Sequence, residues 1–162
     1  MRAILPLCAA MPERAVPTGQ TILQEGQRSG ALYVLVEGSV EVLKGDVQVN
    51  TVSDPGAVFG EMSVLLDTPH VATVRTLAPS RFRVSDDAAH FLASDPAVGL
   101  VVARLLARRL NAVITYLADL KRQFEGEDDH LGMVDEVLET LVHHQGEEPS
   151  PGSDRDPDPT VS

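Results

Sequence analysis

The chain has 162 residues, of which 43% are hydrophobic, so it is long enough for one ordinary domain with a sizeable core. Aromatic residues make up only 4% and Trp is absent, which excludes an aromatic platform that stacks the bases of single-stranded nucleic acid. The formal net charge is −11, and the single cysteine, Cys8, excludes an internal disulfide and gives no sign of a zinc site.

The negative charge is concentrated at one end of the chain. Residues 1–124 carry 12 acidic and 12 basic side chains, whereas residues 125–162 carry 12 acidic and one basic. An acidic segment of this kind disfavours nucleic acid and anionic membranes, because phosphate groups require a basic surface. Solvated disorder is the simplest interpretation of this segment, and a specific binding role is the alternative.

The N-terminus is briefly apolar but does not form a secretory signal. A signal core needs roughly 7–15 apolar residues, and Pro6 interrupts this stretch early. No run of about 20 apolar residues exists, so no membrane-spanning helix is predicted. We therefore expect a soluble, cytoplasmic protein that has no contact with membranes.

After a helical or irregular lead-in over residues 1–15, the pattern from Val16 onward is that of short β-strands. The stretch 31–44 alternates, with apolar residues at one parity and polar residues at the other, which is typical of half-buried strands. Further strands are predicted around residues 21–23, 47–49, 71–77 and 81–84. Short strands that are closely spaced and separated by turns indicate a mainly β fold, a small sandwich or jelly-roll barrel.

The period changes to that of helices after Ser85. The stretches Ser85-Asp86-Asp87 and Ser94-Asp95-Pro96 are plausible helix starts, and Pro96 suits a first helical turn. A long helix from Pro96 to about Phe124 then carries apolar residues at spacings of four and three. They are Leu106, Leu110, Val113, Leu117, Leu120 and Phe124. This heptad seam predicts a homodimer contact through residues 102–124, and packing against the chain's own β-domain is the alternative.

The last part of the chain divides into three predicted segments. Residues 125–130 form an acidic break, residues 131–145 form a short amphipathic helix, and residues 146–162 are too polar to fold. The helix together with the acidic tail, residues 131–162, offers a possible surface for a protein partner.

The stretch FGEMSVLLDTPHVATVRT, residues 59–76, contains the strongest functional signal. A glycine before a helix start allows close approach to the unpaired N–H groups of the first turn, which suits an anion such as a phosphate. Glu61 would repel a phosphate, so it makes sense only as an acceptor from a ligand hydroxyl, such as that of a ribose. Phosphate and hydroxyl together predict a nucleotide ligand.

These residues resemble the cyclic nucleotide-binding domains of bacterial catabolite-activator-type regulators, kinase regulatory subunits and gated channels. The resemblance begins at GQTILQEGQ and YVLVEGSVEV and covers about residues 16–124. It implies an eight-stranded antiparallel β-roll followed by a long C-terminal helix, and the pattern of residues 131–145 adds the short extra helix. It also implies a cyclic AMP or cyclic GMP ligand and a regulatory role.

The resemblance assigns roles position by position. It implies that Gly60 and Glu61 form the phosphate-binding cassette, with Glu61 on the ribose 2′-hydroxyl, and that Met62 and Ser63 offer backbone amides to the phosphate. Where the family has an arginine that pairs with the phosphate, this chain has His70. The remaining predicted ligand-binding positions are Val71, Ala72, Val113 and Ile114, which in relatives include polar residues.

The sequence supports three hypotheses about function. The first is a sensor domain that binds a cyclic nucleotide or a similar small anion, with His70 in place of the arginine. The second is a degenerate, non-binding domain that acts as a dimeric interaction scaffold. The third, a DNA-binding regulator, is disfavoured because the residues after the long helix are few and carry the whole net charge of −11.

An enzyme is not expected from this sequence. Ser63 lacks the second glycine of a nucleophile elbow, and Glu61 has no evident catalytic companion. The pair His143–His144 could bind a metal in principle, but it more simply suits the C-terminal end of a helix. We predict no catalytic residue, no metal site and no cofactor other than a bound nucleotide.

Overall fold

The computed structural model describes residues 2–124 and 131–143. The predicted acidic break 125–130, the tail 146–162 and His144 lie outside the described residues. The described chain divides into two units, one that ends at Leu106 and one that begins at Ala107. The long helix α3 belongs to both, and each unit is described here by itself.

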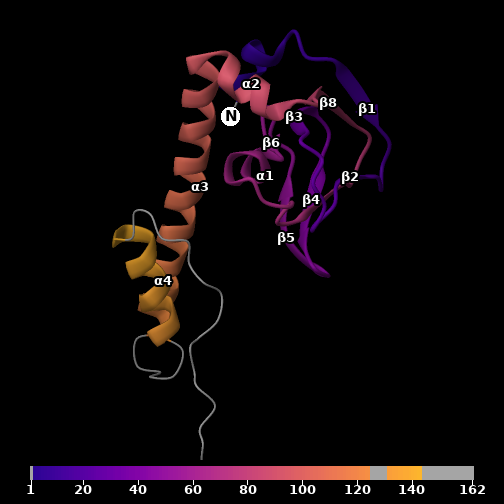
Figure 1. The fold of residues 1–162 in the computed structure, drawn as a ribbon. Coiled ribbons are helices and arrows are strands. Elements are labelled where there is room, and N and C mark those ends of the chain that lie inside the picture. Colours follow the sequence, from indigo (N-terminus) through magenta and orange to yellow (C-terminus); the bar gives the residue numbers. More distant parts are fainter. Residues whose placement is uncertain (1, 125–130, 144–162) are drawn as a thin grey trace, which may run out of the picture. The chain divides into compact units, whose positions relative to one another are not determined.

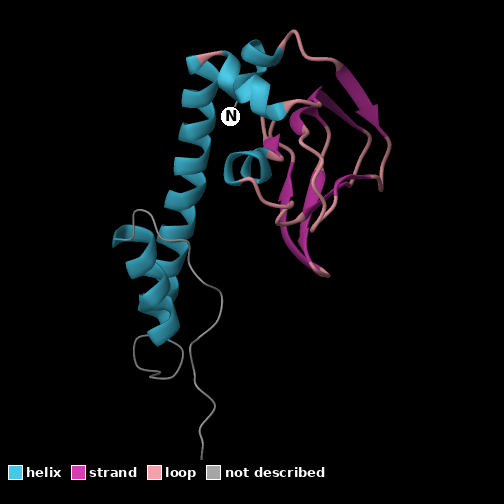
Figure 2. Ribbon diagram, viewed as in Figure 1, coloured by secondary structure: helices cyan, strands magenta, loops and turns pink. Residues whose placement is uncertain are grey.

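The first unit is a β-roll with short helices, as predicted (Figures 1 and 2). Its eight strands form two four-stranded antiparallel sheets, ordered β1-β8-β3-β6 and β2-β7-β4-β5. The strands are β1 Glu13–Val16, β2 Thr21–Leu23, β3 Leu32–Glu37, β4 Val40–Lys44, β5 Val47–Val52, β6 Val58–Phe59, β7 Thr73–Thr76 and β8 Ser80–Ser85. The helices are the 3-10 helix η1 Arg2–Cys8, α1 Glu61–Leu66, α2 Ala88–Ser94 and the beginning of α3 Pro96–Gln123.

The interior of the roll is an apolar core between the two sheets. Tyr33 and Leu35 of β3 meet Phe82 of β8 there, and the Tyr33 and Phe82 rings lie edge to face with their centroids 5.7 Å apart. Such a pair adds about 0.5–1.5 kcal/mol to the free energy gained by burial. The core fixes the two sheets face to face, and the loops at their ends carry the candidate site.

Strand β3 is buried on both faces, which corrects the prediction of a half-buried strand. Leu32 and Val34 point away from the roll interior and pack in a second cluster with residues of η1, α2 and α3, including Ile4, Ala88 and Val102. The helices cover this outer face, so both parities of the strand are apolar, as in the run Leu32–Leu35.

The predicted helix starts are confirmed by their caps. The Asp87 side chain accepts a hydrogen bond from the His90 N–H at the start of α2, and the Asp95 side chain accepts one from the Ala97 N–H at the start of α3. Pro96 opens α3 without the loss of a hydrogen bond, because an N–H group at the first helical position has no intrahelical acceptor.

The second unit consists of the remainder of α3 and of α4, Leu131–His143. Lys121 of α3 forms an ion pair with Asp135 of α4. The heptad seam is only partly covered: Leu117 and Leu120 are half-buried, whereas Leu110, Val113 and Phe124 are exposed. Helix α4 also has an exposed apolar stripe with a spacing of four residues, at Met133, Val137 and Leu141.

Candidate functional site

The Gly60–Glu61 pair stands at the start of α1, where the sequence predicts the cassette. Gly60 has φ 96°, a left-handed conformation that favours glycine. A Cβ atom at this position would lie 2.4 Å from the backbone oxygen of Ala31, so the space also excludes any larger residue. The cassette glycine is therefore required both by its backbone conformation and by its neighbour.

The first turn of α1 is tied to the loop that follows it. Glu61 is buried, with 2% of its surface exposed, and Met62 is exposed. The Ser63 hydroxyl donates to the Thr68 carbonyl oxygen at 2.6 Å, and the Thr68 N–H donates to the Ser63 carbonyl oxygen at 3.1 Å. The Thr68 hydroxyl is buried and has no hydrogen-bond partner within the part of the chain that the structure describes.

His70 is buried in the loop after α1 and belongs to a dense set of hydrogen bonds. Its Nε2 atom lies 2.8 Å from the hydroxyl of Ser29, in the loop between β2 and β3. Its backbone N–H donates to the Gln27 carbonyl oxygen and its own carbonyl oxygen accepts from the Gly26 N–H, both at 2.9 Å. Three contacts thus join His70 to the segment 26–29.

Burial also changes the acid–base behaviour of His70. Removal of the imidazole from water disfavours its charged form and lowers its pKa below the usual value. Near neutral pH the side chain is therefore an uncharged group that hydrogen-bonds Ser29, in contrast to the permanent charge of an arginine.

Two cations flank the same loop. Arg28 donates from its two terminal nitrogens to the side chain and to the carbonyl oxygen of Asp67, both at 2.8 Å. Lys44, at the end of β4, donates to the Val71 carbonyl oxygen at 2.8 Å and to Glu25 at 2.6 Å. The Lys44 ammonium lowers the pKa of the Glu25 carboxyl. Sequence reasoning missed Arg28, Ser29 and Lys44, because their partners lie 19 to 41 residues away along the chain.

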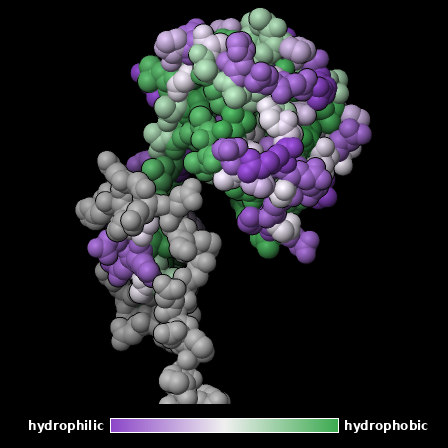
Figure 3. All heavy atoms as spheres, viewed as in Figure 1, coloured by the Kyte–Doolittle hydropathy of each residue, from purple (hydrophilic) through white to green (hydrophobic). Residues whose placement is uncertain are grey.

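The other predicted site residues are less closely connected. Val71 is exposed and Ala72 is half-buried, and both lie in the loop before β7. Val113 and Ile114 lie in the part of α3 that belongs to the second unit, so their role at the ligand stays a prediction. Exposed apolar side chains surround the cassette at Met62, Leu65, Leu66 and Val71, and Figure 3 shows apolar surface at α1.

Residues 13–89 match the model of the family described as the cyclic nucleotide-binding domain. These matched residues form a domain of the cyclic nucleotide-binding family. The predicted resemblance is thereby confirmed, and the β-roll and the Gly60–Glu61 cassette lie within the matched residues.

Relatives support the same assignment. The chain is 29% identical over 124 residues to a CRP-like cAMP-activated global transcriptional regulator of Mycobacterium tuberculosis H37Rv. The aligned region covers 73% of this chain and 55% of the relative. The chain therefore spans about half the length of that regulator.

Two solved structures share the fold and are more than 25% identical to this chain over the aligned residues. The Thermus thermophilus catabolite activator protein has a TM-score of 0.60 at 26% identity, over 73% of this chain and 58% of its own. A cyclic nucleotide-binding domain from Methylobacillus flagellatus has a TM-score of 0.56 at 29% identity, over 70% of this chain and 67% of its own.

Other kinds of site find no support in the described part of the chain. Residues 2–124 and 131–143 contain no group of three or more His, Cys, Asp or Glu side chains that could hold a metal ion. In the same residues, no helix is both long and apolar enough to cross a membrane. Cys8, the last residue of η1, is buried, which raises the pKa of its thiol, so it does not have the features of a reactive cysteine.

Proposed function

We propose that this chain is a regulatory module that binds a cyclic nucleotide, cyclic AMP or cyclic GMP, at the cassette of α1. The observation that carries this proposal is the retained Gly60–Glu61 pair in a chain of this family, with Gly60 in a conformation and a space that only glycine fits. The backbone conformation of Gly60 supports an intact cassette, although the family's arginine is replaced by His70.

Each cassette residue has a role in the proposed complex. The backbone amides of Met62 and Ser63, in the first turn of α1, face the phosphate, since the first turn of a helix has unpaired N–H groups. The Glu61 carboxylate accepts a hydrogen bond from a ribose hydroxyl. The exposed apolar side chains beside the cassette, among them Leu65 and Val71, supply surface for the base.

The first experiment is calorimetric titration with cyclic AMP and cyclic GMP between pH 5.5 and pH 8. The phosphate favours the charged imidazole, so binding takes up a proton at His70 and affinity rises as pH falls. Because burial lowers the pKa of His70 in the free protein, we expect the affinity to keep rising toward the acid end of this range.

His70→Gln is the matched variant for this titration, since it retains a hydrogen-bonding side chain beside Ser29 but cannot take up the charge. We expect it to bind with an affinity that does not change over the same range. An equal rise in both proteins would assign the proton uptake to another group. The absence of binding at millimolar ligand at every pH would contradict the proposed function.

A dimeric scaffold without a ligand is the second candidate function. It is favoured by the uncharged, buried state of His70, whose Nε2 atom is already paired with Ser29. In this reading the exposed stripe of α4, at Met133, Val137 and Leu141, is the surface for a protein partner. The His70→Arg experiment described below distinguishes the two functions.

In either function we propose a homodimer through residues 102–124 of α3. Leu110 and Val113 are exposed members of the heptad seam, and a second copy would bury them. Leu110→Glu is therefore expected to convert a dimer to a monomer in analytical ultracentrifugation. Ala112→Glu adds the same charge at an exposed position outside the seam and is expected to remain dimeric. A monomeric wild-type protein at high micromolar concentration would contradict the dimer.

A further inference from the structure

The candidate site requires a permanent positive charge that its own cassette does not supply. A bound cyclic phosphate is an anion, and position 70 offers a buried imidazole with a lowered pKa. Glu61, the first residue of α1, places a carboxylate in the cassette itself. This inference rests on the proposed function, because it concerns which residue neutralises the ligand there.

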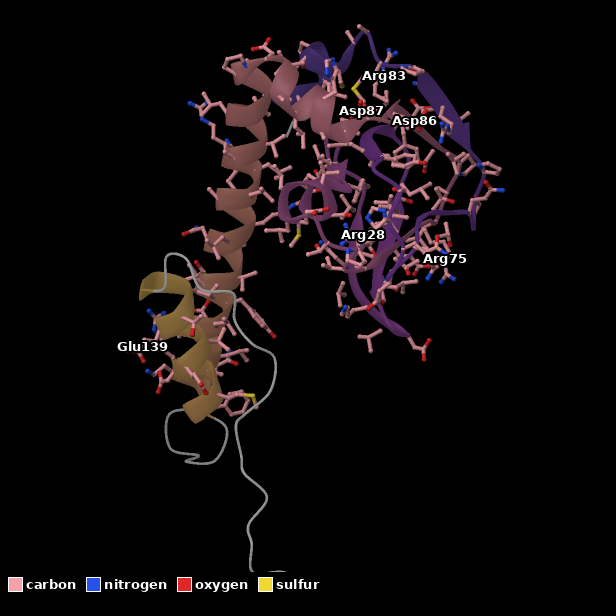
Figure 4. The ribbon with its side chains drawn as sticks, in the orientation of Figure 1. Arg28, Arg75, Arg83, Asp86, Asp87 and Glu139 are labelled. Atoms are coloured by element: carbon pink, nitrogen blue, oxygen red, sulfur yellow. The ribbon has the colours of Figure 1, made fainter. Side chains whose placement is uncertain are left out.

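Arg28 stands in the segment that is joined to His70. The backbone of Gln27 and the hydroxyl of Ser29, the residues on either side of Arg28, both contact His70. Adjacent Cα atoms are about 3.8 Å apart, so the Arg28 side chain leaves the backbone next to the position where the family's arginine stands. Figure 4 labels Arg28 close to α1.

In this structure, the guanidinium of Arg28 binds Asp67, a partner that a phosphate could replace. It binds the Asp67 side chain and carbonyl oxygen at the C-terminal cap of α1. The two side chains are 57% and 96% exposed, and water and salt screen an exposed ion pair so that it contributes little to stability. A phosphate that offers two oxygens to the same fork competes well with this arrangement.

Lys44, the other cation beside the loop, is less suited to this role. Its ammonium is held by the Glu25 carboxylate and by the Val71 carbonyl oxygen. The Glu25 side chain is only 27% exposed, against 96% for Asp67, and it also accepts a hydrogen bond from the Gly45 N–H. Lys44 therefore stabilises the loop, and its single charged group does not offer the fork that fits two phosphate oxygens.

We infer that Arg28 is the phosphate-binding arginine of this chain and exchanges Asp67 for the ligand when a cyclic nucleotide binds. The charge that the family places at position 70 is supplied here from the neighbouring β2–β3 loop. Asp67 is the resting partner of Arg28 and competes with the ligand for it.

The test is calorimetric titration with cyclic AMP at pH 7.5, at which His70 is uncharged. Loss of a charge-assisted hydrogen bond costs about 1.5–3 kcal/mol, so we expect Arg28→Ala to weaken binding roughly 10- to 150-fold. Arg28→Lys is expected to bind with intermediate affinity, because it keeps the charge and loses the fork. Arg122→Ala removes an exposed, ion-paired arginine of the second unit and is expected to bind as the wild type does.

Asp67→Asn separates ligand binding from a merely structural role of the pair. Asn tolerates the left-handed backbone at this position, φ 51°, and it removes the competing charge. If Arg28 binds the phosphate, this variant binds cyclic AMP as tightly as the wild type or up to about five-fold more tightly. If the pair only fixes the loop, Asp67→Asn weakens binding as Arg28→Ala does, and the inference is overturned.

The inference and the proposed function fail in different ways. Wild-type binding that Arg28→Ala leaves unchanged contradicts the role of Arg28 and leaves the proposed function intact. A wild-type protein that does not bind cyclic AMP or cyclic GMP contradicts both. Circular dichroism and thermal melting of every variant show whether a loss of affinity reflects loss of the fold.

Discussion

Replacement of Gly60 by alanine is expected to destabilise the first unit and to abolish cyclic nucleotide binding. The new Cβ atom would lie 2.4 Å from the Ala31 carbonyl oxygen, and backbone atoms cannot yield as a flexible side chain can. The left-handed backbone adds a cost of about 1–3 kcal/mol for a residue that is not glycine. For a unit of this size each 1 kcal/mol lowers the melting temperature by about 4–8 °C.

Gly19→Ala is a matched control for this change. Gly19 also has a positive φ, 81°, but nothing lies within 4 Å of the position of a new Cβ atom. It therefore imposes similar backbone strain without the collision. We expect Gly60→Ala to melt well below Gly19→Ala and only Gly19→Ala to bind cyclic AMP. Equal melting temperatures would show that the contact with Ala31 relaxes easily.

The local features of the fold could be predicted from the sequence because their causes are local. Asp87 and Asp95 cap helices through hydrogen bonds to residues two or three positions away. The glycine of the cassette and the start of α1 are likewise encoded within a few residues. Patterns of this kind are visible in one stretch of sequence.

Features that depend on other parts of the chain were predicted less well. The predicted strand 71–77 is shorter in the structure, Thr73–Thr76, because Val71 and Ala72 belong to the loop, where Lys44 holds the Val71 carbonyl oxygen. The second buried face of β3 depends on helices that are distant in sequence.

The same limit applies to the candidate site. The sequence identified His70 as a departure from the family but gave no indication that Ser29, 41 residues away, is its partner. Nor could it show that Arg28 lies on Asp67, since an exposed arginine in a polar loop has many possible partners. The charge balance of the site depends on contacts between separate loops, and only the folded chain brings them together.

His70→Arg is the variant that distinguishes a functioning site from a vestigial one. It restores the fork that the family places beside the phosphate, so a site whose phosphate meets no other cation is expected to gain roughly 10- to 150-fold in affinity. The affinity of the variant should be independent of pH between 6 and 8, because arginine stays charged. His90→Arg adds the same charge at an exposed position of α2 and is expected to have no effect.

The pattern of binding in wild type and variant then decides the function. Binding by both proteins, tighter in His70→Arg, supports the sensor. Binding by His70→Arg alone supports the scaffold, with a cassette that kept its backbone geometry and lost its charge. The absence of binding in both, in a variant that melts normally, would mean that the cassette itself no longer accepts a nucleotide.

The same substitution also tests Arg28 through a double-mutant cycle. If Arg28 already binds the phosphate, a second guanidinium at position 70 meets an anion that is partly neutralised, and the gain in wild type is small. In the Arg28→Ala background the gain should be several-fold larger, because the new arginine then replaces the missing charge. Equal gains in the two backgrounds would show that position 28 and position 70 act independently, and that the phosphate is neutralised without Arg28.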